Sequence, residues 1–142
     1  MSILEKTLTQ LREENETRRD AFLKEAICQK INDSIREIHI TARDGAQENI
    51  VLTTQDADAL REAVLKHYEG FDTFLISKYP KIRKDDLQIC HLYLLGLDER
   101  QIAVLKCKTY SAIKKRANTL ASLLKIEGSL QDFLLKHPPF TS

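Results

Sequence analysis

The sequence contains few of the residues that interrupt helices. Only four glycines and three prolines occur in 142 residues, and so few breakers favour helices over a turn-rich β fold. A chain of this length suits one domain, or a small domain with an extended arm. The composition therefore predicts an all-α protein.

Cysteine is also scarce. Cys28, Cys90 and Cys107 are widely spaced and form no CxxC pair. An odd number in this arrangement argues against a disulfide framework or a zinc site, and a reducing compartment is the simpler assumption. Cys90 lies in a strongly apolar segment and is expected to be a core thiol. For Cys107, between two lysines, two interpretations stay open: a thiol packed in a turn, or a redox-reactive one.

Long apolar runs and catalytic motifs are missing as well. The first fifteen residues carry early acidic side chains and do not resemble a secretory signal, and no segment approaches the roughly 20 apolar residues that span a bilayer. The four histidines have no partner at ligand or triad spacing, and no glycine-rich phosphate loop occurs. We expect a cytoplasmic protein that is not an enzyme, with no cofactor, no metal and no evident small-molecule substrate.

Charge is unevenly distributed although the net charge is only +1. Residues 1–80 hold 11 Lys and Arg against 15 Asp and Glu, whereas residues 81–125 hold 10 against 4. A basic segment in an otherwise balanced chain is typical of contact with nucleic acid.

The N-terminal segment has the spacing of a coiled-coil seam. Leu4, Leu8 and Leu11 follow the alternating 4 and 3 pattern, and the same register reaches Phe22. We therefore expect one long helix over Ile3–Ile40, bent near Arg18–Phe22, that forms a homodimer through these four apolar residues.

In the rest of the chain, residues that start and end helices recur at short intervals, which predicts a series of short helices. A loop is expected over Thr41–Asn49, and the helices after it are predicted from their caps and apolar faces. Their expected spans are Thr53–Glu69, Phe71–Tyr79, Asp85–Leu95, Asp98–Cys107, Thr109–Lys125 and a closing helix from Ser129. The predicted organisation is a helical arm and loop over 1–49, a connector over 50–80 and a helix-turn-helix domain over 81–142.

The helices Asp98–Cys107 and Thr109–Lys125 are separated by only one or two residues. Helices joined so tightly cross steeply, which is the arrangement that places a second helix in a DNA groove. Lys114, Lys115 and Arg116 supply adjacent cations on that second helix. Cations there neutralise phosphates, and exposed polar side chains read base edges.

Residues 80–135 resemble the LuxR-type tetrahelical helix-turn-helix domain. The resemblance rests on DLQICHLYLLGL, QIAVL, KTYSAI, the long basic helix and the terminal SLQDFL, in that order. With the upstream YEGFDTFLISKYPKIRKDDL, they look most like the variant that ends Bacteroidetes regulators. Many of those carry tetratricopeptide repeats, a membrane-spanning helix and a coiled coil before it.

The resemblance implies a recognition helix over Tyr110–Leu124 and a DNA-binding transcriptional regulator that acts as a dimer on double-stranded DNA. The residues that it assigns to DNA contact are Tyr110, Ser111, Lys114, Lys115, Arg116, Asn118 and Thr119. Ile102, Ala103, Ile113 and Leu120 are expected to pack inside.

Two other interpretations stay open. Where the family pattern leads us to expect arginine, this chain has Ala117 and Thr119, and Cys107 stands where glycine is usual. These departures suggest a protein-interaction module whose helix-turn-helix scaffold has lost DNA affinity. Alternatively, the chain is the cytoplasmic part of a longer membrane-anchored sensor.

Overall fold

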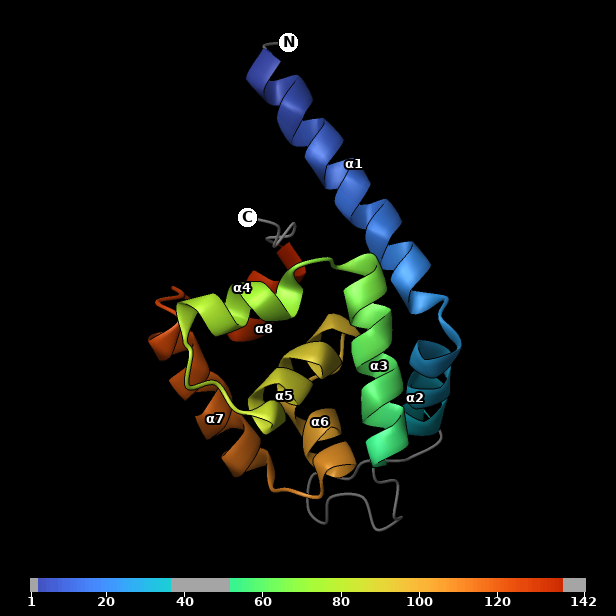
Figure 1. Cartoon of the computed structure of the whole chain (residues 1–142), viewed down its shortest axis with the longest axis vertical. Coiled ribbons are helices and arrows are strands. Elements are labelled where there is room, and N and C mark those ends of the chain that lie inside the picture. Colours follow the sequence, from blue (N-terminus) through green and yellow to red (C-terminus); the bar gives the residue numbers. More distant parts are fainter. Residues whose placement is uncertain (1–2, 37–51, 137–142) are drawn as a thin grey trace.

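The computed structural model describes residues 3–36 and 52–136, and these form eight helices and no strand. The described protein is therefore all-α, as predicted, with the shorter helices gathered into a body and one helix projecting from it (Figure 1). In chain order the helices are α1 (Ile3–Leu23), α2 (Ala26–Arg36), α3 (Thr54–His67), α4 (Phe71–Lys78), α5 (Lys84–Leu94), α6 (Glu99–Lys106), α7 (Tyr110–Leu123) and α8 (Leu130–Lys136).

The N-terminal segment forms two helices where we expected one bent helix. The chain turns at Lys24 and Glu25, whose backbone N–H groups bond to Ala21 and Phe22, and α2 then lies against α3. The turn comes after the predicted bend at Arg18–Phe22. The remainder of the predicted helix, and the predicted loop Thr41–Asn49, lie outside the described residues.

Tertiary contacts account for the position of this turn. The Phe22 ring is fully buried and meets the Tyr68 ring edge-on, with centroids 5.2 Å apart. Three residues later, the Glu25 carboxylate contacts His67 Nε2 at 2.8 Å and Lys66 Nζ at 3.1 Å. A continuous helix would carry these residues past α3, whereas the turn brings α2 back beside it.

A single cluster of buried side chains runs from the end of α1 to α8. Phe71 and Leu75 from the predicted connector share it with Ile89 and Leu92 of the predicted DNA-binding part, so no gap in the core marks residue 80. Helix α5 contacts α3, α6, α7 and α8. This central position explains why apolar residues occupy most of its circumference after the first turn.

The stretch from α6 to α7 is held by local caps that the sequence predicted. The Asp98 side chain accepts a hydrogen bond from the Gln101 backbone N–H, and the Gln101 side chain accepts one from the Asp98 N–H. The Thr109 hydroxyl accepts from the Ala112 N–H at the start of α7. Between the two helices, Cys107 has a left-handed backbone (φ 54). Glycine adopts this conformation without strain, which explains why it is usual at such a turn.

Candidate nucleic-acid interface

Helix α7 has one buried side and one exposed side. Ile113, Ala117, Leu120 and Ala121 face the core at the spacing of one helix face. Ile102 and Ala103 of α6 are buried with them. The four positions expected to pack inside therefore do so. The remaining face of α7 is left to solvent.

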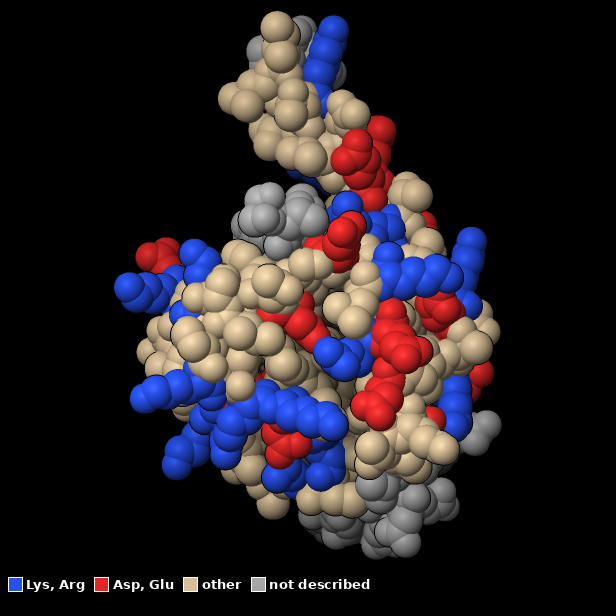
Figure 2. Space-filling view, viewed as in Figure 1, with Lys and Arg blue, Asp and Glu red and all other residues tan. Residues whose placement is uncertain are grey.

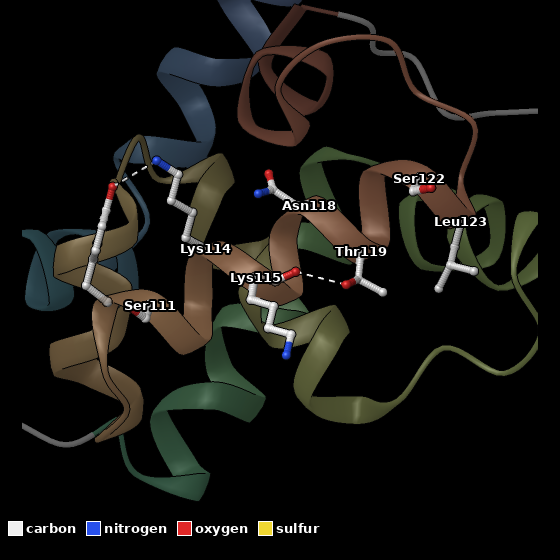
Figure 3. A pocket seen from close by; sticks show the side chains of 8 residues that line it. Ser111, Lys114, Lys115, Asn118, Thr119, Ser122 and Leu123 are labelled. Carbon is white, nitrogen blue, oxygen red and sulfur yellow. Dashed lines mark hydrogen bonds between the residues drawn. The ribbon is translucent and has the colours of Figure 1, made fainter.

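Six of the seven predicted DNA-contact residues share that exposed face. They line an open concavity of about 600 Å³ along α7 (Figure 3). Its lining consists of Tyr110, Ser111, Lys114, Lys115, Asn118, Thr119, Ser122 and Leu123. Ser122 and Leu123 were not predicted, although helical spacing from Asn118 and Thr119 would have placed them there.

The Tyr110 ring, at the start of α7, lies close to two cations. The Arg100 guanidinium lies 5.2 Å from the centre of its ring and Lys114 Nζ lies 5.6 Å from it. Lys114 Nζ also donates a long hydrogen bond of 3.4 Å to the Tyr110 hydroxyl. Sequence reasoning missed Arg100, because it belongs to α6 and only the fold brings it to this face.

Arg116, unlike the other six residues predicted for DNA contact, does not line this concavity. Its Nε and Nη2 atoms donate to the two carboxylate oxygens of Asp86, each at 2.6 Å. Asp86, at the start of α5, is buried and also accepts from the Arg83 backbone N–H at 3.0 Å. The fork of Arg116 therefore fastens α7 to α5.

The electrostatics of this ion pair agree with its geometry. Burial alone would raise the pKa of Asp86, but the hydrogen bonds and charges of Arg116 and Arg83 outweigh it and lower the pKa. The same contact raises the pKa of Arg116. Both groups are therefore charged at neutral pH, and the pair is a permanent feature of the folded chain.

Further cations lie near α7. Figure 2 shows Lys and Arg side chains gathered over α7 and the start of α5. Lys81, Lys84, Lys114 and Lys115 are all exposed, and Arg83 lies 3.8 Å from the Asp86 carboxylate. A surface of this kind attracts a polyanion without reading its sequence.

The two positions that depart from the family pattern differ in their surroundings. Ala117 is buried against the core, so a small apolar residue suits the site and a missing arginine there removes no exposed cation. Thr119 is exposed, and its hydroxyl donates to the Lys115 carbonyl at 2.9 Å. Only position 119 therefore bears on the charge of the exposed face.

The residues predicted for dimerisation divide between two environments. Leu4, Leu8 and Leu11 are 68%, 53% and 45% exposed on the projecting part of α1. Phe22 is buried within its own chain and has no exposed surface for a second copy. This corrects its place in the seam: the available stripe consists of the three leucines.

Cys90 is buried, as expected of a core thiol, whereas Cys107 is exposed and does not pack in the turn. Among the described residues, no group of His, Cys, Asp and Glu side chains is arranged to hold a metal ion. None of the described helices combines the length and apolarity needed to cross a membrane.

The geometry of the exposed α7 face suits a polyanionic partner. Two lysines, a tyrosine and several hydroxyl and amide groups project from one helix whose other side is fastened to the core. Comparison with known proteins adds nothing to this assignment: no protein-family model, no curated protein and no solved structure matches the chain.

Proposed function

We propose that the protein is a cytoplasmic DNA-binding transcriptional regulator that inserts α7 into the major groove of double-stranded DNA and acts as a homodimer. The observation that carries this proposal is the clustering of six predicted contact residues on one exposed face of α7. The short capped turn after α6 supports it, because such a turn joins two helices closely while the outer face of the second one stays exposed.

The chemistry of the face divides between affinity and recognition. Lys114 and Lys115 would neutralise phosphates and release counterions, together with Arg100 beside Tyr110. Ser111, Asn118 and Thr119 would meet base edges, although each offers few hydrogen bonds compared with an arginine fork. We therefore expect salt-sensitive binding with modest sequence preference.

The decisive experiment is a titration of duplex DNA at two salt concentrations. Wild type should bind a mixed-sequence duplex of about 30 base pairs, long enough for two half-sites. Lys114→Glu/Lys115→Glu should weaken binding at least tenfold at low salt and lower the slope of log affinity against log salt by about two.

A matched control changes the net charge equally on the opposite side of the body. Lys24→Glu/Arg36→Glu alters two exposed cations, one just before α2 and one at its end, and should leave DNA affinity close to that of wild type. If wild type and both variants bind equally weakly, the assignment to DNA binding is wrong.

Dimerisation through α1 is the second part of the proposal. Residues 3–14 are exposed throughout, and a solvated helix of that length is marginal in water by itself. Pairing two copies would bury Leu4, Leu8 and Leu11 and would place two α7 helices on one duplex.

Sedimentation measures this part independently of DNA. Wild type should sediment as a dimer at micromolar concentration. Leu8→Glu should sediment as a monomer, and Thr9→Glu, one residue away and outside the leucine stripe, should remain dimeric. A wild-type monomer at high micromolar concentration would refute pairing while leaving the DNA titration to be judged separately.

One observation favours the alternative of a protein-interaction module. The exposed face carries apolar surface at both ends, with Tyr110 40% and Leu123 39% exposed, and Arg116 contributes no charge to it. Recovery of a protein partner that is lost with Tyr110→Ala/Leu123→Ala, without any salt-dependent DNA binding, would select this alternative.

A further inference from the structure

Near its C-terminal end, α1 meets the body of the protein at Arg19. Arg19 Nη1 donates a hydrogen bond of 2.7 Å to the carbonyl oxygen of Leu94, the last residue of α5. The last carbonyl groups of a helix have no partner within that helix, and they carry its partial negative charge. The guanidinium group therefore supplies the end of α5 with both a donor and a positive charge.

Two further residues lie against the same guanidinium group. Gly96 has a left-handed backbone (φ +90), and a Cβ atom at this position would lie 3.0 Å from Arg19 Nη2. Glycine allows both this conformation and this close approach. Burial raises the pKa of the Tyr68 hydroxyl, and the charge and hydrogen bond of Arg19 oppose part of that rise. Arg19 therefore joins α1 both to the residue after α3 and to the link between α5 and α6.

Helix α5 also holds α7. In its first turn, Asp86 accepts two hydrogen bonds of 2.6 Å from Arg116 of α7, and at its last residue Leu94 accepts the bond from Arg19 of α1. The helices α1 and α7 are thus fastened to opposite ends of one helix of 11 residues. Any change in the angle between α1 and α5 would move the exposed leucine stripe relative to α7.

The length of α1 makes this angle important. The helix is continuous from Ile3 to Leu23, so Leu4 lies about 22 Å from Arg19 along the helix axis. A pivot of about 10° at Arg19 would therefore displace Leu4 by about 4 Å. This displacement exceeds the rise of one base pair in a DNA duplex, which is about 3.4 Å.

The other contacts of α1 fix its end more firmly than its direction. The buried Phe22 ring and the Glu25 carboxylate hold the last turn and the residues after it. The direction of a helix is fixed only by a second contact on an earlier turn. Asn15 makes one such contact, a long hydrogen bond of 3.5 Å to the Leu135 carbonyl, whereas the bond of Arg19 is 2.7 Å long. Arg19 therefore provides the stronger restraint.

We propose that Arg19 is the positioning residue that sets the direction of α1 relative to α5 and α7. Its consequence for the DNA partner rests on the function proposed above. Because each arm is held at a fixed angle, a dimer joined through the two arms keeps its two α7 helices at one separation. The target is then a duplex that carries two half-sites at one fixed spacing.

Residual dipolar couplings of the full ¹⁵N-labelled chain test the role of Arg19 without DNA, because they report the direction of each backbone N–H bond in one common frame. In wild type, a single alignment tensor should fit the couplings of α1 together with those of α3, α5 and α7. In Arg19→Ala, the couplings of α1 should shrink and should no longer fit the tensor of the body, while α3, α5 and α7 still share one tensor.

Arg18→Ala is the matched control. Arg18 is the preceding residue of α1 and makes no hydrogen bond with the residues that the structure describes, so this variant should keep the wild-type couplings. If Arg19→Ala lowers the free energy of unfolding but keeps the wild-type couplings of α1, Arg19 only stabilises the fold and the proposal is wrong. If Arg19→Ala does not fold, Arg19→Lys replaces it. Lysine keeps the charge without the guanidinium fork, so the couplings of α1 should again depart from the tensor of the body.

A selection from random duplexes tests the consequence for DNA. From a library with about 40 random base pairs, wild type and Arg18→Ala should enrich two half-sites at one spacing. Arg19→Ala should enrich the same half-sites at several spacings, and a single wild-type spacing in this variant would overturn the proposal. If no chain enriches any sequence, the assignment to DNA binding fails, and the dipolar couplings alone decide the role of Arg19.

Discussion

Two buried aspartates occupy the body of this protein, and their partners differ. Asp86 is 1% exposed, and both of its carboxylate oxygens are engaged, by two hydrogen bonds of 2.6 Å from Arg116 and one of 3.0 Å from the Arg83 backbone. The result is a rigid connection between α5 and α7.

Asp72 is less completely satisfied. It has a short contact of 2.6 Å to His91 and a longer one of 3.4 Å to the exposed Arg61. The imidazole that it holds keeps a buried nitrogen without a partner. This pair joins α4 to α5, and it lines a cavity to which α6 and α7 contribute no residue.

The difference shows how one residue type serves two purposes. A carboxylate with a complete set of donors fixes the backbone around it and withdraws a cation from the surface. A carboxylate with fewer and longer contacts, such as Asp72, holds its neighbours less firmly. The comparison therefore predicts that the Asp86 connection contributes more stability than the Asp72 pair.

The largest effect is expected for Asp86→Ala. It leaves the Arg116 guanidinium half-buried without its acceptor, and breaking such a pair should lower the free energy of unfolding by about 3 kcal/mol. Urea unfolding followed by circular dichroism measures this. The control is Asp33→Ala: Asp33 and its partner Arg36 are both exposed, so the loss of Asp33 should cost at most about 1 kcal/mol. Equal costs would mean that the Asp86 contact is no more than a surface ion pair.

A smaller loss is expected for Arg116→Ala, because Arg83 remains near the carboxylate. We expect about 2 kcal/mol, against less than about 0.5 kcal/mol for the adjacent exposed Lys115→Ala. In the DNA titration the order should be reversed: Lys115→Ala should weaken binding more than Arg116→Ala, provided that both variants remain folded. If Arg116→Ala is as stable as wild type but binds DNA poorly, Arg116 contacts DNA and the prediction is wrong.

Asp72→Asn should cost less again. The amide keeps an oxygen that can accept from His91 Nε2, so the loss is that of charge assistance, about 1 kcal/mol. Asp86→Asn is the matched substitution, and it should cost more because its amide nitrogen must replace an oxygen that accepts from Arg116 at 2.6 Å, whereas the corresponding contact of Asp72 with Arg61 is 3.4 Å. Thermal unfolding at pH 7 compares the two directly; a larger cost at position 72 would reverse the comparison.

The smallest effect is a difference in acid sensitivity. The folded chain lowers the pKa of Asp86 and of Asp72 below the ordinary value, so the unfolded chain binds more protons and stability falls as the pH drops below about 5. Asp86→Asn removes one carboxylate that takes up a proton on unfolding. The free energy of unfolding should then fall less steeply with decreasing pH, by less than about 1.4 kcal/mol per pH unit. Unfolding free energies between about pH 6 and pH 3 would reveal this, and an unchanged slope would argue against a shifted Asp86.

The features that could be predicted from the sequence are those set by neighbours in the chain. The caps at Asp98, Thr109 and Thr53 each depend on a residue three positions away, and each forms as expected. The exposed set on α7 follows from helical spacing once Ile113 and Leu120 are assigned to the core.

What could not be predicted depends on contacts between distant segments. The turn at Lys24 contains no glycine or proline, and it forms where Phe22 and Glu25 meet α3. The Arg116 side chain binds Asp86, which lies thirty residues earlier in the chain. His91 uses Nε2 for Asp72, which lies in another helix, and its Nδ1 is left without a hydrogen-bond partner. No local sequence pattern predicts this arrangement.

The left-handed turn at Cys107 has a practical consequence. Burial raises the pKa of Cys28 to about 12 and also raises that of Cys90, and both thiols are enclosed by the core, whereas Cys107 is exposed. The native chain should therefore accept a single maleimide dye at one position, three residues before Tyr110. A fluorescent reporter placed there would register anything that docks on α7 without a single substitution in the protein.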